Sequence, residues 1–207
     1  MIRGIISDLD GTLLDSMEAR LDAWIGAFTR FGVEVPRNDL KPLIGLPGVD
    51  LAGKYYEYPR KIEEAEESIF GEKLPQIELF PDVFPTFNIL LEKGMKIVIV
   101  TSGRREAVSR IKLPVNDIVT IDDVKVGKPH TEPYEKALKI MGLKPSEVLV
   151  VGDSENDMIP ARTLGSVSVL VRHGNHNVSD HADYMIDEIG ELPKLIEHIN
   201  GRSPVQL

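Results

Sequence analysis

Apolar residues along the chain form five short runs that are rich in β-branched side chains. The runs lie at residues 2–7, 96–101, 117–121, 148–152 and 167–171. Most of them lack a strict alternation of apolar and polar positions, which is typical of parallel strands buried on both faces. Each run therefore predicts one strand of a parallel sheet.

Helical patterns separate the later runs. They cover residues 82–93, 104–111, 132–141 and 155–164, and the last contains Pro160, so this helix is expected to bend or to begin late. Because strands alternate with helices, the pattern predicts an α/β fold with a doubly wound parallel sheet.

The segment 16–81 interrupts this alternation, because it contains no convincing strand. Helical patterns are found near residues 16–31, 38–44, 51–58 and 60–73. The segment is too long for an unstructured connection within a compact domain. We therefore predict a small all-helical domain at 16–81, inserted into a core domain formed by residues 1–15 and 82–207. The glutamates at 63, 64, 66 and 67 are interpreted as a solvated helix face.

The net charge and the absence of cysteine limit the ligands and environments that this chain is expected to have. The 207 residues carry a formal net charge of −9 and include no cysteine. An acidic chain without a basic stripe is not expected to bind nucleic acid, and thiolate chemistry is excluded. The apolar runs are far shorter than the ~20 residues of a membrane span, and no export signal is recognised, so we expect a cytoplasmic protein without membrane contact. Phosphate chemistry on such a chain would need a divalent cation.

Polar residues lie at the ends of the apolar runs or, for Lys128, in the segment that follows the third run, and ligands of open parallel sheets bind at this edge. The residues concerned are Asp8, Asp10, Gly11, Thr101, Ser102, Gly103, Lys128, Asp153, Asn156 and Asp157. Crowded carboxylates repel each other, and a divalent cation such as Mg²⁺ relieves the repulsion. A carboxylate can attack phosphorus, a second one can transfer protons, and a lysine can neutralise a phosphoryl group. The set therefore predicts phosphoryl transfer through an aspartyl phosphate.

Four segments resemble, in order, the four signatures of the haloacid dehalogenase superfamily. They are residues 8–16 (DLDGTLLDS), 97–103 (IVIVTSG), 127–129 (GKP) and 152–157 (GDSEND). Together they are specific, although each alone is weak. The resemblance implies a Rossmann-like core, with a helical cap domain that closes over the core and selects the substrate.

The resemblance also implies a role for each residue. Asp8 would be the nucleophile and a Mg²⁺ ligand, and Asp10 the general acid/base with its carbonyl on the metal. Thr101 would bind phosphate beside the Ser102 and Gly103 amides, and Lys128 would orient the nucleophile and neutralise the phosphoryl group. The remaining metal ligands would be Asp153, directly, and Asp157, through water. Asn156 could brace the loop, and Gly11 lets the backbone approach the ligand.

The branch of the superfamily that fits best is that of phosphoglycolate phosphatase and β-phosphoglucomutase. The second aspartate, Asp10, separates the chain from true dehalogenases, and Gly152 before Asp153 favours a hydrolase over a mutase. We expect a Mg²⁺-dependent phosphatase acting on a small phosphorylated metabolite, as a monomer or small homo-oligomer. A phosphomutase and a non-enzymatic phospho-acceptor switch remain as alternatives.

Two further groups of polar residues lie outside the four motifs. Basic residues of the helical segment could meet a substrate carboxylate; they are Arg20, Arg37, Lys41, Lys54 and Arg60. The three histidines at 173, 176 and 181 could suggest a metal site, but their polar, glycine-containing surroundings favour a solvated loop.

Overall fold

The computed structural model describes residues 1–44, 46, 48–109, 111–175 and 178–201. The chain forms two compact units. The first, which we call the sheet unit, comprises Met1–Leu13 and Leu79–Leu207. The second, the helical unit, comprises Leu14–Glu78. The chain thus leaves the sheet unit after Leu13 and returns to it at Leu79.

A six-stranded sheet with the order β3-β2-β1-β4-β5-β6 forms the centre of the sheet unit. The strands are β1 (Gly4–Ser7), β2 (Lys96–Val100), β3 (Asp117–Val119), β4 (Val148–Gly152), β5 (Val167–Val171) and β6 (Tyr184–Ile186). All neighbouring strands are parallel, and Ser7 of β1 pairs with Ile99 of β2 and with Val151 of β4. The expected α/β fold with a Rossmann-like parallel sheet is confirmed.

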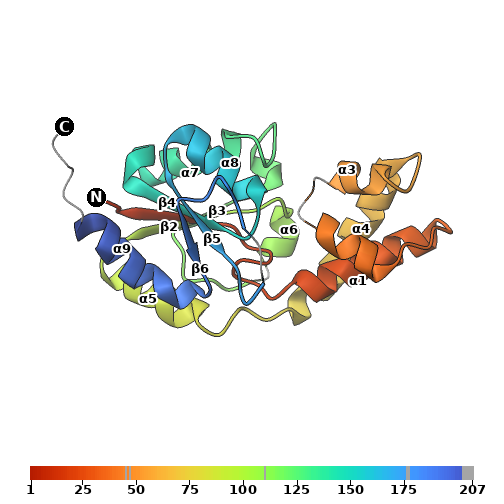
Figure 1. Ribbon diagram of the computed structural model, residues 1–207, viewed down its shortest axis with the longest axis horizontal. Helices are drawn as coiled ribbons and strands as arrows, with labels where there is room; N and C mark the ends of the chain where they lie inside the picture. Colours follow the sequence, from red (N-terminus) through yellow and green to blue (C-terminus); the bar gives the residue numbers. More distant parts are fainter. Residues whose placement is uncertain (45, 47, 110, 176–177, 202–207) are drawn as a thin grey trace. The chain divides into compact units, whose positions relative to one another are not determined.

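Helices cover both faces of this sheet (Figure 1). Helices α7 (Glu132–Met141) and α8 (Glu155–Leu164) lie on one face, and α5 (Val83–Glu92) and α9 (Leu192–Gly201) lie on the other. The central strands are completely buried between these layers, as their apolar runs predict. Shorter helical turns complete the unit: α6 (Arg105–Val108), η3 (Ile121–Asp123), η4 (Pro145–Glu147) and η5 (Ile189–Glu191).

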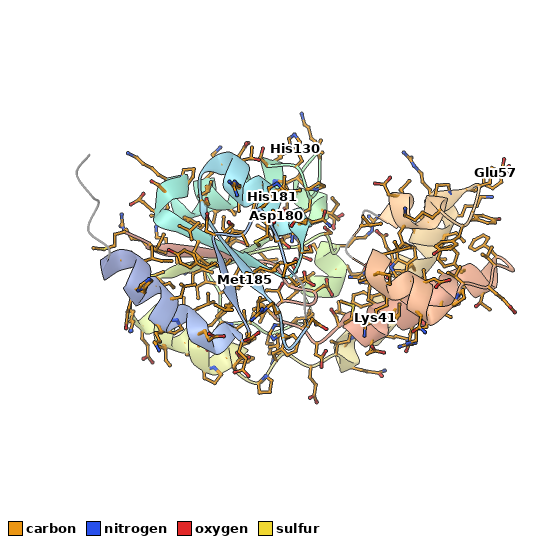
Figure 2. All side chains as sticks on the ribbon, in the orientation of Figure 1. Lys41, Glu57, His130, Asp180, His181 and Met185 are labelled. Atoms are coloured by element: carbon orange, nitrogen blue, oxygen red, sulfur yellow. The ribbon has the colours of Figure 1, made fainter. Side chains whose placement is uncertain are left out.

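The sequence pattern missed the last strand and the last helix of the sheet unit. Strand β6 has only three residues, and Met185 at its centre is 49% exposed on the edge of the sheet (Figure 2). A short edge strand with mixed burial gives no recognisable period. Helix α8 continues through Pro160 from Glu155 to Leu164, so it does not begin late.

The helical unit is built around two long helices, α1 (Met17–Arg30) and α4 (Pro59–Lys73). Shorter helices α2 (Arg37–Leu40), η1 (Lys41–Leu43), α3 (Gly48–Gly53) and η2 (Leu74–Gln76) complete it. Its own core contains Trp24 and Phe28 from α1, Leu51 from α3 and Ile62 from α4. The predicted helix at 51–58 is displaced, because α3 ends at Gly53.

One glutamate of the predicted solvated face is buried instead. Glu66 is 3% exposed and forms an ion pair of 3.1 Å with Arg20, whose guanidinium also lies 3.5 Å from the centre of the Phe70 ring. A buried carboxylate needs such a partner, because desolvation disfavours its charge. Arg37, another proposed substrate contact, forms ion pairs with Glu18 and Asp22.

Within the described residues, no helix has both the length and the apolar character that a membrane crossing requires.

Candidate active site

The candidate site lies at the carboxyl ends of β1 and β4, the two central strands. The chain runs from β1 outward to β2 and β3, then returns to the other side of β1 as β4. Such a change of direction opens a crevice beside the strand ends. Asp8 follows β1, and its backbone amide continues the sheet by donating to the Val151 carbonyl at 2.9 Å. Asp153 follows β4 in the same way.

Lys128 joins two of the predicted site carboxylates. Its ammonium nitrogen lies 2.5 Å from Asp8 Oδ1 and 2.7 Å from Asp157 Oδ1, and the lysine side chain is only 5% exposed. The second oxygen of Asp8 accepts a hydrogen bond of 3.1 Å from the Thr12 hydroxyl. Both oxygens of Asp8 are therefore held in defined positions by donors.

Asp157 is completely enclosed at the start of α8. Its Oδ1 accepts hydrogen bonds from Lys128 and from the Tyr134 hydroxyl, the latter at 2.8 Å, and the Ser154 hydroxyl donates to Oδ2 at 3.3 Å. Tyr134 on α7 also lies 3.2 Å from the Asn156 carbonyl. That carbonyl would bond to the amide of residue 160 in a regular helix, but Pro160 has none. The phenol hydroxyl thus lies within hydrogen-bond distance of both a site carboxylate and the Asn156 carbonyl.

Three carboxylates form an all-oxygen cluster at this edge. One oxygen each from Asp8, Asp153 and Asp157 lies within 4.8 Å of the others. Two glycines make room for the cluster. A Cβ at Gly11 would lie 2.3 Å from Asp153 Oδ2, and one at Gly152 would lie 2.4 Å from Asp157 Cγ. Gly11 also has a φ of 76°, a conformation that side chains disfavour. Hard oxygen donors in a closely packed cradle fit a divalent cation such as Mg²⁺.

The protonation equilibria reflect this crowding. Burial raises the pKa of Asp157 to about 6, although Lys128 opposes the shift. Burial, together with repulsion by Asp8 and Asp157, raises the pKa of Asp153 well above its usual range. Burial alone would lower the pKa of Lys128, but attraction by Asp157 and Asp8 raises it. The lysine is therefore a permanent cation, whereas the carboxylates gain from a second positive charge.

The loop after β2 brings a hydroxyl to the neighbouring strand end. Thr101 is 4% exposed, and its backbone amide donates to the Val119 carbonyl at 3.0 Å. The Gly103 amide donates to Thr101 Oγ1 at 3.0 Å. Because this oxygen accepts the amide proton, its own proton remains available to a ligand oxygen. The Gly103 amide is used inside the loop, and Ser102 is exposed.

The structure thus brings Asp8, Lys128, Asp153 and Asp157 into one cluster, with Gly11 against it. Asp10 follows the nucleophile candidate by two residues in the same loop and is partly buried. Asn156 contributes its carbonyl to the Tyr134 contact.

Sequence reasoning missed three participants: Thr12, Tyr134 and His173. Thr12 lies four residues after Asp8 in the first motif, and Tyr134 resembles any core aromatic residue. His173, expected in a solvated loop, instead contacts the Thr12 carbonyl and the Phe80 ring. His181, labelled in Figure 2, contacts Glu155 at 2.7 Å, and His176 lies outside the described residues.

The parallel sheet with an aspartate cluster at the ends of β1 and β4 is the arrangement of a hydrolase that acts on phosphate groups. The comparisons with known proteins point to the same class of enzyme. Residues 5–171 match the haloacid dehalogenase-like hydrolase family, and the chain belongs to that family. It is an enzyme of the phosphoric ester hydrolase class, as the four motifs predict.

Individual relatives are similar over nearly the whole chain. Pyrophosphatase PpaX of Bacillus cereus (strain AH820) is 31% identical, and the alignment covers 96% of this chain and 98% of the relative. Among solved structures, a predicted phosphoglycolate phosphatase from Haemophilus somnus is 22% identical with a TM-score of 0.80, covering 94% of this chain and 98% of the other. CbbY from Rhodobacter sphaeroides, solved in complex with phosphate, is 21% identical with a TM-score of 0.77, covering 93% and 96%.

Proposed function

We propose that this protein is a Mg²⁺-dependent phosphatase that hydrolyses a small phosphorylated metabolite through an aspartyl phosphate on Asp8. The observation that carries the proposal is the buried Lys128, which bridges Asp8 and Asp157 beside a third carboxylate. Two hydrogen-bond donors fix Asp8, and its strand places it at the edge where ligands of this fold bind. A structural ion pair would not require a third carboxylate within 4.8 Å of the other two.

In the first half-reaction, a carboxylate oxygen of Asp8 attacks phosphorus, and the bond from phosphorus to the leaving oxygen breaks. Asp10 donates a proton to the leaving oxygen. In the second half-reaction, Asp10 takes a proton from water, the water oxygen attacks phosphorus, and Asp8 is released together with inorganic phosphate. The same residue thus serves as acid and then as base.

Charge stabilisation comes from residues around the nucleophile. Lys128 keeps its positive charge beside Asp8 and offsets the negative charge of the transferring group. Thr101 donates its hydroxyl proton to a phosphoryl oxygen, and the Ser102 amide is a second candidate donor. The Gly103 amide would have to leave Thr101 Oγ1 to take part.

The metal would be held by the carboxylates of Asp8 and Asp153, by the Asp10 carbonyl, and by Asp157 through water. When bound, Mg²⁺ supplies positive charge that polarises the phosphoryl group and relieves repulsion among the aspartates.

We infer that the helical unit is the cap domain of this family and contributes to substrate choice. The relative named as a pyrophosphatase makes pyrophosphate a candidate substrate, and the solved structures add phosphoglycolate and sugar phosphates. A phosphomutase would use the same nucleophile but would return the phosphoryl group to the substrate instead of releasing it.

The test is a panel of phosphorylated metabolites that includes pyrophosphate, phosphoglycolate and hexose phosphates, assayed for phosphate release with Mg²⁺ and with EDTA. We expect Mg²⁺-dependent release, and loss of at least about 10³-fold in kcat for Asp8→Asn, since a neutral amide cannot act as nucleophile. Asp39→Asn, an exposed aspartate of α2, is the matched control. Isomerisation of a hexose phosphate without phosphate release would favour the mutase, and wild-type turnover in Asp8→Asn would end the assignment.

A further inference from the structure

His173 occupies a turn position that ordinarily suits other residues. The amide of Asn175 donates to the Arg172 carbonyl at 2.9 Å, and the two central residues, His173 and Gly174, have φ values of 47° and 78°. Positive φ at both central positions is the pattern of a type I′ turn, which favours asparagine, aspartate or glycine at the first of them. Among the described non-glycine residues, His173 is the one with positive φ.

The surrounding structure holds this turn in place. The His173 amide donates to the Asp187 carbonyl at 2.9 Å, and the Arg172 amide donates to the Ile186 carbonyl at 3.0 Å. These bonds continue the pairing of β5 with β6 beyond the strand ends. A residue held in a disfavoured conformation by its neighbours is a candidate for a functional side chain.

Among the described residues, the imidazole contacts both segments where the chain leaves and re-enters the sheet unit. Its Nε2 lies 2.8 Å from the Thr12 carbonyl, and its ring stacks on Phe80 with 3.5 Å between ring centres and 10° between planes. A carbonyl only accepts hydrogen bonds, so Nε2 carries the proton. The Phe80 amide in turn donates to the Leu13 carbonyl at 2.9 Å. His173 therefore contacts both of the segments that connect the sheet unit to the helical unit, one at Thr12 and the other at Phe80.

One of these segments leads directly to the nucleophile. The Thr12 hydroxyl donates to Asp8 Oδ2 at 3.1 Å, so the residue whose carbonyl is held by His173 also holds the reactive carboxylate. If Thr12 shifted, Asp8 would lose one of the two donors that define its position. Misplacement of a nucleophile by a fraction of an ångström lowers its reaction rate without preventing substrate binding.

We propose that His173 is a positioning residue for the reaction, acting through the Thr12 carbonyl to hold the nucleophile loop in its reactive arrangement. The proposal rests on the proposed function for its kinetic consequences. It requires the Nε2 donor, and not merely a flat ring on Phe80.

Three substitutions separate the donor from the ring and from the turn. His173→Gln keeps an amide donor at nearly the same distance from the backbone but loses the ring. His173→Phe keeps the stack but has no donor. His173→Asn suits the turn, so a fall in its activity cannot come from backbone misfit, but its short amide cannot reach Thr12. His198→Phe, an exposed histidine of α9, is the control for loss of a histidine elsewhere.

The kinetic measurement is kcat and KM for p-nitrophenyl phosphate with saturating Mg²⁺. We expect His173→Phe and His173→Asn to lower kcat about tenfold, the effect expected when one positioning hydrogen bond is lost, with KM changed less than about twofold. His173→Gln should retain at least half of the wild-type kcat, and His198→Phe should match the wild type. A kcat within twofold of wild type for both donor-less variants, or an equal loss in His173→Gln, would overturn the proposal.

A second measurement does not depend on catalysis. Amide hydrogen exchange of the metal-free proteins, followed in peptides that contain Leu13 and Phe80, should be faster in the two donor-less variants than in His173→Gln or the wild type. Unchanged exchange in these peptides would contradict the anchoring role, whatever the activity. An inactive wild type with the expected exchange pattern would instead refute the proposed function while leaving the anchoring contact supported.

Discussion

Substituting Asp157 by asparagine should stabilise the metal-free protein while impairing its response to Mg²⁺. The pKa of Asp157 rises from its ordinary value of 3.8 to about 6 in the folded chain, mainly because the side chain is buried. Each pKa unit corresponds to about 1.4 kcal/mol, so the ionised carboxylate costs the folded state ~3 kcal/mol above pH 6. The attraction of Lys128 is already included in that balance. The neutral asparagine avoids this cost.

The hydrogen-bond geometry allows the replacement. Asparagine Oδ1 can accept from Lys128 and Tyr134 as the carboxylate does, and its Nδ2 can donate to the Ser154 oxygen, which lies 3.3 Å from Asp157 Oδ2. The variant therefore resembles the protonated wild type, with every described partner retained.

The assay is urea unfolding in EDTA across a pH series. The raised folded-state pKa means that the contribution of Asp157 to stability is most favourable below pH 3.8 and is lost as the pH rises through about 6. Asp157→Asn should therefore exceed the wild type in free energy of unfolding by ~3 kcal/mol at pH 8, and the difference should vanish near pH 4. Asp39→Asn should show no such trend. A variant that is no more stable than the wild type at pH 8, or a difference that grows toward acid pH, would refute the reasoning.

Two further substitutions address the supports of the same carboxylate. Tyr134→Phe removes the hydroxyl that donates to Asp157 Oδ1 and also lies 3.2 Å from the Asn156 carbonyl. It should lower the free energy of unfolding by ~1–2 kcal/mol, because the Asp157 acceptor is buried. Urea unfolding at pH 7 measures this change, and an unchanged midpoint would show that the phenol is dispensable. Gly152→Ala would place a Cβ 2.4 Å from Asp157 Cγ, so we expect the apparent Mg²⁺ constant for activation to rise at least about tenfold through displacement of that carboxylate. Normal Mg²⁺ activation of this variant would mean that Asp157 does not contribute to the metal site.

Much of this protein can be predicted from local sequence. The strands β4 and β5 coincide with their predicted runs because they are continuous apolar segments buried within the sheet, and the helices α7 and α8 span their predicted ranges. The sequence predicts the aspartates at 8 and 153 as site candidates because buried parallel strands bring the residues that follow them to one edge. Strand β6 was not predicted from the sequence, because it is a three-residue edge strand whose central residue is half-exposed.

Contacts between residues far apart in the chain required the folded structure. Lys128 lies 120 residues from Asp8, and His173 lies 161 residues from Thr12, and no local pattern joins either pair. Burial of Glu66 beside Arg20 likewise depends on the packing of α4 against α1, which charge patterning along α4 does not reveal. Sequence determines which segments are apolar and which polar residues follow them. The three-dimensional packing decides which polar groups are removed from water. A polar side chain that has lost its hydration needs a protein partner, and this need fixes the position of donors such as Lys128 and shifts the pKa of carboxyls such as Asp157.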